Sequence, residues 1–547
     1  MSSVYAYREN EVRSLASKQN SVMSDTRLDW SNRYNAHSLH VFGGARIHWE
    51  TYTYNSQLGY DTGSDKTPFM SAALKNATSN GLNESWNTMS LYAQAEYNYK
   101  GRYFLQANLT ADGSSRFGED ADGLKALDAV WAIFPSVQAS WVLTNEPWLA
   151  NNPSINYLRL TAGYDVSGND DIDYYAARSY FQGKVFMNSV SGLSLAGIGN
   201  TTIQWETTKR FNLGLEASLL NNRIGVSVNY FKSKTDNLLT MQSLGFLSGL
   251  NKNWSNGGKL ENEGYDFSIN AKVLALKDWS WQLGASVGHY KNKITALPAA
   301  EGYMDTEVYG ATVRTQVGQA ANLFYGYKTE GVFATTKEAQ EAGLYMLGEN
   351  GVTRNYFQAG DMHFMDADGN KEINENDRVV IGDPNPDIYG NIFTTLAWKR
   401  LKLDLRFNYS LGNDVYNYMR SQLEGGNRFM NQTTAMQNRW QVEGQQTNMP
   451  RATFQDPMGN ARFSDRWIED GSYLKLKTIT LSYDLPITSQ FLQGLQFWIQ
   501  ANNVFTLTKY LGSDPESAMT SSVIGQGIDL GRLPQSTSLV AGVKINL

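Results

Sequence analysis

The chain has 547 residues, a formal net charge of −6 and no cysteine. Its acidic and basic residues are interspersed, so the sequence offers no basic face for nucleic acid, and without cysteine it has no disulfides or thiolate metal sites. Charged residues make up only 18% of the chain, below the usual share of about 25%. No run approaches the roughly 20 apolar residues of a membrane-spanning helix.

Strand patterns separated by turn signals begin near residue 90 and continue to the end of the chain. Residues 90–99 and 103–109 flank Lys100-Gly101-Arg102, a tight-turn signal, and together predict a β-hairpin. The other predicted strands are residues 136–143, 157–164, 211–219, 224–230, 265–273, 279–290, 388–398, 401–409, 473–483, 495–505 and 538–547.

The hairpin at residues 211–230 shows the pattern most fully. Leu213 and Leu215 lie on one face of its first strand, and Asn212 and Glu216 lie on the other, because side chains alternate along a strand. A β-sandwich also has a polar face, so alternation leaves both architectures open. Sandwich strands have about 5–6 residues, however, whereas membrane barrel strands need about 9–11. We therefore predict an all-β fold, a transmembrane antiparallel β-barrel.

The connections between the predicted strands alternate in length. Short turns at 100–102, 220–223 and 399–400 contrast with long polar segments at 167–203, 297–387, 411–470 and 507–536, which we predict to be extracellular loops. Residues 338–344 predict a short helix inside the second of these. A phase shift of the apolar stripe near Thr478 predicts a β-bulge.

The acidic loop at residues 366–377 is the sharpest local motif. Oxygen-bearing side chains follow the spacing of an EF-hand calcium loop, which wraps several oxygens around one cation. The usual glycine position holds Lys371, and an acidic surface turn held by local hydrogen bonds is the alternative. The candidate Ca²⁺ ligands are Asp366, Asp368, Asn370, Glu372, Asn374 and Asp377.

Two further groups of residues are candidates for contact with a solute. Lys402, Asp404, Arg406 and Glu216 would lie on the polar face, where they line either a solute path or a salt-bridged wall. The loop aromatics would stack on sugar rings or anchor loops to one another; they are Trp254, Tyr416, Trp440 and Trp467. No nucleophile elbow, P-loop or dinucleotide fingerprint is present, so we expect no catalytic residues and no enzymatic activity.

An ordered set of motifs along the chain resembles the SusC/RagA family of TonB-linked outer-membrane transporters of Bacteroidetes. Each motif is weak alone, but together they extend from about residue 90 to residue 516. The motifs include Asp112-Gly-Ser-Ser-Arg116, Trp205-Glu-Thr-Thr208, Asp377-Arg-Val-Val-Ile-Gly382, Asp470-Gly-Ser-Tyr473 and Asp514-Pro-Glu516.

The resemblance implies a barrel of about 22 strands around an internal plug, in contact with the lipid of a Gram-negative outer membrane. It also implies a SusD-like lipoprotein partner, energy from the TonB complex, and oligosaccharides or peptides as solutes. Residues 1–547 would form the C-terminal portion of such a barrel, without its plug and N-terminal domains. A passive outer-membrane porin and a soluble β-sandwich glycan-binding protein are the alternatives.

Overall fold

A computed structural model describes residues 10–61, 66, 69–70, 74–186, 190–243, 250, 252–487, 492–516 and 522–546. The chain divides into two compact units. Unit 1 consists of Met1–Trp141, Thr161–Phe211 and Ser233–Lys259, and unit 2 of Val142–Leu160, Asn212–Lys232 and Leu260–Leu547. Leu547, the last residue of the final predicted strand, lies outside the described residues.

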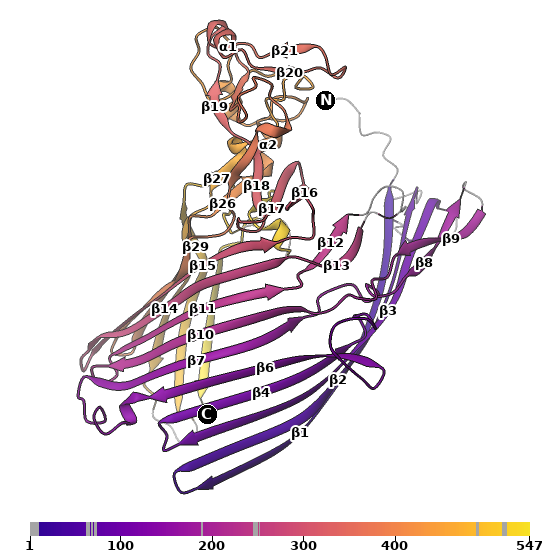
Figure 1. The fold of residues 1–547 in the computed structure, drawn as a ribbon. Coiled ribbons are helices and arrows are strands. Elements are labelled where there is room, and N and C mark those ends of the chain that lie inside the picture. The colour runs from indigo at the N-terminus through magenta and orange to yellow at the C-terminus, as the bar shows by residue number, and fades with distance from the viewer. Residues whose placement is uncertain are drawn as a thin grey trace. The chain divides into compact units, whose positions relative to one another are not determined.

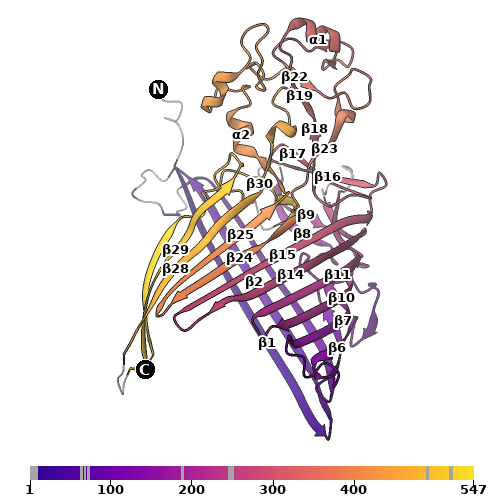
Figure 2. The same cartoon turned by 90° about the vertical axis from the view of Figure 1, so that its left-hand side faces the viewer.

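The dominant element is a 16-stranded sheet, ordered β1-β2-β3-β4-β6-β7-β10-β11-β14-β15-β24-β25-β28-β29-β31 with β5 paired to β6 (Figures 1 and 2). Its strands are β1 Glu11–Tyr34, β2 His37–Tyr60, β3 Lys75–Tyr99, β4 Tyr103–Ser114, β5 Leu124–Ala126, β6 Ala129–Val142, β7 Ile155–Asn169, β10 Glu206–Leu219, β11 Ile224–Asp236, β14 Lys259–Ala275, β15 Trp279–Ala296, β24 Ile388–Trp398, β25 Leu401–Leu411, β28 Tyr473–Leu485, β29 Gly494–Thr508 and β31 Ser538–Asn546.

Every predicted strand is present, and the predicted span 388–398 coincides with β24. Most of the other observed strands extend beyond the ends predicted for them. The sequence prediction missed β1 and β2, which have 24 residues each. Segments such as Ser17 to Ser21 in β1 are polar on both faces, so they lack the alternation on which the prediction depended.

The predicted tight turn at Lys100-Gly101-Arg102 joins β3 to β4. Lys100 and Gly101 have φ angles of 55° and 65°, the left-handed conformation that a type I′ turn requires at both central positions. The Gly101 amide donates to Asn98 Oδ1 at 2.8 Å. The turn chemistry read from the sequence therefore fixes the register of this hairpin.

The predicted β-bulge is also present. In β28, Leu476 pairs with Phe407 of β25 and Thr478 pairs with Arg406, which leaves Lys477 as the extra residue. Before the extra residue the apolar side chains are Leu474 and Leu476, at even positions, and after it they are Ile479 and Leu481, at odd positions. The insertion of one residue compensates for this change of phase. Both pairs consequently lie on the same face of the sheet.

The long connections contain folded structure of their own. In unit 1 the added strands are β8 Tyr180–Phe186, β9 Val190–Gly197, β12 Leu239–Ser243 and β13 Lys252–Asn256. In unit 2 they are β16 Tyr303–Val308, β17 Ala311–Gln316, β18 Leu323–Tyr327, β19 Thr329–Val332, β20 Tyr345–Leu347, β21 Arg354–Tyr356, β22 Met362–Phe364, β23 Arg378–Gly382, β26 Asp414–Asn417, β27 Ile468–Asp470 and β30 Ile528–Asp529.

Among the described residues, two short α-helices lie in the long segments of unit 2, α1 Thr336–Ala342 and α2 Tyr418–Leu423 (Figure 1). Helix α1 overlaps the predicted helix at 338–344 and starts earlier, because Thr335 and Glu338 form a capping box. The 3₁₀ turns are Leu143–Asn145, Glu375–Asp377, Thr434–Asn438, Asp465–Trp467 and Val523–Gly525. Among the helices of the described residues, none has the length and apolar content required to cross a bilayer.

We call the segments 297–387 and 412–472 of unit 2 the loop region, and strands β14, β15, β24, β25, β28, β29 and β31 the strand wall. Two apolar cores involve the loop region. One includes Phe333, Phe357 and Phe364, and the other includes Phe324 and Trp467. A third core, in unit 1, surrounds Phe117 and Trp205. The loop region is therefore a packed structure with its own interior.

Candidate functional site

One face of the strand wall is apolar and exposed. Strand register aligns Trp279, Trp398, Leu401, Tyr483, Phe497 and Val543 in one row across six strands. The exposed fraction is 47% for Trp398, 44% for Phe497 and 54% for Val543. A soluble protein seldom exposes so continuous an apolar surface, so this face requires an apolar environment.

Aromatic side chains gather beside the short turns. In unit 2, Trp279 and Trp398 stack with ring centroids 5.8 Å apart, next to the turn at 399–400. In unit 1, Tyr103 stacks between Tyr99 and Trp141 at 6.3 and 6.2 Å, next to the turn at 100–102. Rows of Tyr and Trp at strand ends are typical of the two interfaces of a membrane barrel.

The opposite face of the strand wall carries the predicted polar-face charges. Asp404 accepts hydrogen bonds from Thr395 Oγ1 at 2.7 Å and from Arg406 Nε at 3.0 Å. Lys402 and Arg406 are exposed on β25, and Glu216, which lies outside the strand wall, is exposed on β10. The contacts of Asp404 fit the interpretation as a salt-bridged wall, and the use of this face as a solute path remains a prediction.

A polar hollow of about 450 Å³ lies on the strand wall and the adjoining β11. Its lining is rich in hydroxyl and amide groups, and includes Asn229, Ser286, Asn408, Tyr409 and Tyr473. Such groups both donate and accept hydrogen bonds. The hollow therefore has the chemistry to bind hydroxyl or amide groups of a polar solute.

Two of the quoted sequence motifs meet in a buried charge cluster. Lys475, only 3% exposed, lies with its Nζ 3.1 Å from Asp514 Oδ2 and 2.6 Å from Glu516 Oε2. Lys477 Nζ lies 2.8 Å from the same Glu516 oxygen, and Tyr473 donates to Glu516 Oε1 at 3.1 Å. The cluster ties the long segment after β29 to the polar face of β28. Sequence spacing could not reveal this pairing, since the partners lie about forty residues apart.

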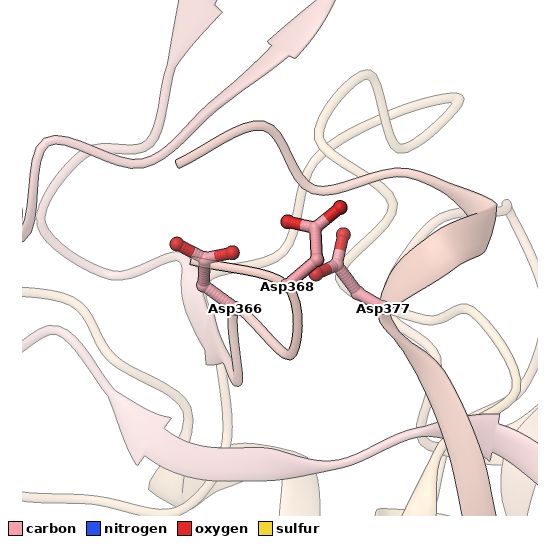
Figure 3. A group of neighbouring side chains, drawn as sticks. All are labelled: Asp366, Asp368 and Asp377. Carbon is pink, nitrogen blue, oxygen red and sulfur yellow. The ribbon is translucent and has the colours of Figure 1, made fainter. Parts of the chain in front are cut away.

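The acidic loop brings three carboxylates together. Asp366, Asp368 and Asp377 each place one oxygen so that the three atoms lie within 4.8 Å of one another (Figure 3). Asp377 is fully buried, Asp366 is partly buried and Asp368 is exposed. The predicted spacing is therefore matched by spatial convergence of three of the six candidate ligands.

Hydrogen bonds to the backbone hold the acidic loop in shape. Asp366 accepts from the amides of Gly369 and Lys371, both at 2.9 Å, and Asp377 accepts from Ala367 and Asn374, both at 2.8 Å. Lys371 has a φ angle of 68°, so it adopts the left-handed conformation for which glycine is usual. Asn370, Glu372 and Asn374 bond mainly among themselves and to nearby amides.

The four loop aromatics divide into two pairs. Trp467 has no exposed surface, its Nε1 donates to Arg462 O at 3.0 Å, and Tyr416 is 3% exposed in the same core, where burial raises its pKa to about 12. Of the two alternatives for these rings, burial rules out stacking on a solute because neither offers a free face; their packing anchors loop segments instead.

Trp254 and Trp440 are only partly buried. Trp254 Nε1 donates to Asp173 at 2.8 Å in unit 1, and Trp440 Nε1 donates to Ala334 O at 3.0 Å in unit 2. Each ring is thus held by one end, and its stacking on a solute stays a prediction.

Comparison with known proteins identifies the family. Residues 2–417 match the family described as TonB dependent receptor-like, beta-barrel. The chain belongs to this family. Its members are receptors and transporters rather than enzymes, and membership excludes the β-sandwich alternative because the family fold is a barrel.

The relatives also agree with the motif-based resemblance. The chain is 28% identical to TonB-dependent receptor P3 of Formosa agariphila, over 96% of this chain and 52% of that protein. It is 25% identical to TonB-dependent receptor SusC of Bacteroides thetaiotaomicron, over 92% of this chain and 48% of that protein. The chain therefore spans about half the length of the relatives it matches.

A solved structure shows the same fold. The RagAB peptide importer in its closed-closed state aligns with a TM-score of 0.80 and 22% identity, covering 97% of this chain and 56% of that chain. Together with the named SusC relative, this confirms the resemblance to the SusC/RagA family.

Proposed function

We propose that this chain forms the membrane wall and loop region of a SusC-like, TonB-dependent importer in the outer membrane of a Gram-negative bacterium. The observation that carries the proposal is the exposed apolar row from Trp279 to Val543, opposite a polar face that holds Asp404 and Arg406. Such a wall satisfies its backbone groups between strands and turns its apolar side chains toward lipid.

The solutes in this proposal are oligosaccharides or peptides. Support comes from the hydroxyl-rich and amide-rich hollow of about 450 Å³ on the strand wall, which suits either chemistry. A SusD-like lipoprotein would cover the outer mouth, and the TonB complex would supply energy through a plug, as the family resemblance implies. The charges of the polar face would act on the solute by position and electrostatics, without chemical conversion.

The test is uptake in cells that carry the full-length gene product. Fluorescent oligosaccharides and fluorescent oligopeptides are offered to strains with and without the gene, each with and without a functional TonB. Uptake of one solute class that needs both the gene and TonB is the expected result. Uptake that needs the gene but persists without TonB overturns the proposal in favour of a passive porin.

The proposal includes a Ca²⁺ site in the acidic loop, supported by the convergence of Asp366, Asp368 and Asp377. Hard oxygen ligands and a compact loop suit this ion. Calorimetric titration of the purified full-length protein with CaCl₂ should show one site, which Asp366→Asn weakens at least about tenfold because a charged ligand is lost. Glu349→Gln, outside the acidic loop, is the matched control. Unchanged binding in Asp366→Asn, or none in the wild type, contradicts the site.

A further inference from the structure

Arg466 lines a cavity of about 400 Å³ inside the loop region. The same cavity is lined by Arg420 and Glu424 of α2 and by the amide side chains of Asn438 and Asn448. Its volume falls within the range of small-molecule sites. All of these residues belong to unit 2.

Arg466 lacks a carboxylate partner among the described residues. Its Nη2 donates to the backbone oxygen of Glu424 at 3.1 Å, and its guanidinium lies 4.3 Å from the centre of the Trp467 ring. Its Nη1 is buried and has no hydrogen-bond partner in the described chain. A buried cationic donor left unpaired is costly, so Arg466 retains the capacity to bind an anion.

The carboxylates nearest to Arg466 already have hydrogen-bond partners. Glu424 accepts from Arg420 Nε at 2.9 Å and from Thr433 Oγ1 at 2.9 Å. Glu469 accepts from Arg420 Nη1 at 2.8 Å and from the Leu511 amide at 2.8 Å. Arg420 therefore holds two carboxylates, and both carboxylates have further partners.

Asp456, whose charge also acts on Arg466, has hydrogen-bond partners of its own. It accepts from the amides of Asn460 and Ala461, both at 2.7 Å. Burial, aided by the nearby charge of Arg420, lowers the pKa of Arg466 to about 10, as expected of a cation without a close anion. Of the two arginines that line the cavity, Arg466 is the one with no carboxylate within salt-bridge distance among the described residues.

We propose that this cavity binds the carboxylate group of a ligand through Arg466, with Asn438 and Asn448 available to the ligand's neighbouring polar groups. A guanidinium presents paired donors that match the two oxygens of a carboxylate. The free carboxyl end of a peptide and a uronic acid sugar share this chemistry. The inference deepens the proposed function and depends on it only for the step that makes this ligand the imported solute.

The test measures ligand-observed NMR binding to the purified full-length protein. The probes are trialanine against trialanine amide, and digalacturonic acid against its dimethyl ester. The wild type should bind at least one carboxylate form about tenfold more tightly than its neutral partner. A preference for trialanine over its amide identifies the carboxyl end of a peptide as the ligand group, and a preference for digalacturonic acid over its ester identifies a uronic acid. Equal binding of the charged and neutral probes in both pairs overturns the proposal.

Variants assign the preference to the cavity. Arg466→Gln should abolish it, and Arg466→Lys should retain only part of it because the planar fork is lost. Arg354→Gln removes the same charge from an exposed strand of the loop region and should leave the preference intact. Full preference in Arg466→Gln overturns the proposal.

Ala435→Trp provides an independent check, because it fills the cavity and keeps the arginine. It should prevent binding of the charged probe even if Arg466→Gln fails to fold. Retained binding in a folded Ala435→Trp variant overturns the proposal. These measurements require neither TonB nor transport, so their failure is distinct from a failure of the uptake experiment.

Discussion

The strand wall and the loop region of unit 2 use the same apolar residue types in opposite ways. In the wall, Leu481 and Phe497 are 42% and 44% exposed on one continuous face. In the loop region, Trp467 and Phe364 have no exposed surface. The loop region is stabilised by its own interior in water, whereas the wall leaves its apolar face for lipid.

Because of this contrast, we expect substitutions in the two regions to reduce stability under different conditions. A substitution in the loop interior removes packing wherever the protein is studied. A substitution on the outer face of the wall matters mainly when a bilayer surrounds it. Four variants test this difference.

Trp467→Ala should have the largest effect. It empties a fully buried site and should lower the free energy of unfolding of the loop region by about 3–5 kcal/mol. Urea titration followed by limited proteolysis within residues 412–472 measures it. Phe429→Ala, at a position 92% exposed, should have almost no effect. Equal proteolysis in the two variants would contradict a packed loop interior.

Lys475→Met should destabilise the attachment of the segment after β29 to the wall by about 3 kcal/mol, because it removes the cation that lies 3.1 Å from the buried Asp514 carboxylate. Thermal melting of the full-length protein measures the loss. The double variant with Asp514→Asn should recover much of it. A single variant as stable as the wild type would show that the cluster contributes nothing.

Leu481→Arg should cost about 2–4 kcal/mol in lipid vesicles, where a charge on the outer face meets hydrocarbon. Thr480→Arg, on the polar face opposite Asp404, should cost much less. Folding titrations in vesicles compare the two. Similar costs would mean that the faces have been assigned the wrong way round.

Asp377→Asn should have the smallest effect, about 1–3 kcal/mol in the loop region. One of the two backbone N–H groups that donate to the Asp377 carboxylate would then face the NH₂ group of asparagine and lose its hydrogen bond. Asp368→Asn, at an exposed position of the same loop, is the control. Hydrogen exchange at the amides of Ala367 and Asn374 reports the change, and unchanged protection would contradict the role of Asp377.

Two local features of the structure followed from nearby sequence. The acidic spacing predicted the convergence of Asp366, Asp368 and Asp377, and the phase shift near Thr478 predicted the bulge at Lys477. The cluster of Lys475 with Asp514 and the cavity at Arg466 were not predictable. Both depend on contacts between side chains that are far apart in the chain, and the local sequence pattern does not indicate which loops pack together.

The sequence by itself determined the strands of the strand wall, their apolar faces and their tight turns, because alternation and turn conformation depend on residues next to one another in the chain. Only the tertiary structure decided that Tyr416 and Trp467 lie in a core while Trp398 and Phe497 remain exposed. The composition of a segment cannot distinguish these outcomes. What surrounds an aromatic ring depends on segments far away in the chain, and on whether the surrounding medium is protein, water or lipid.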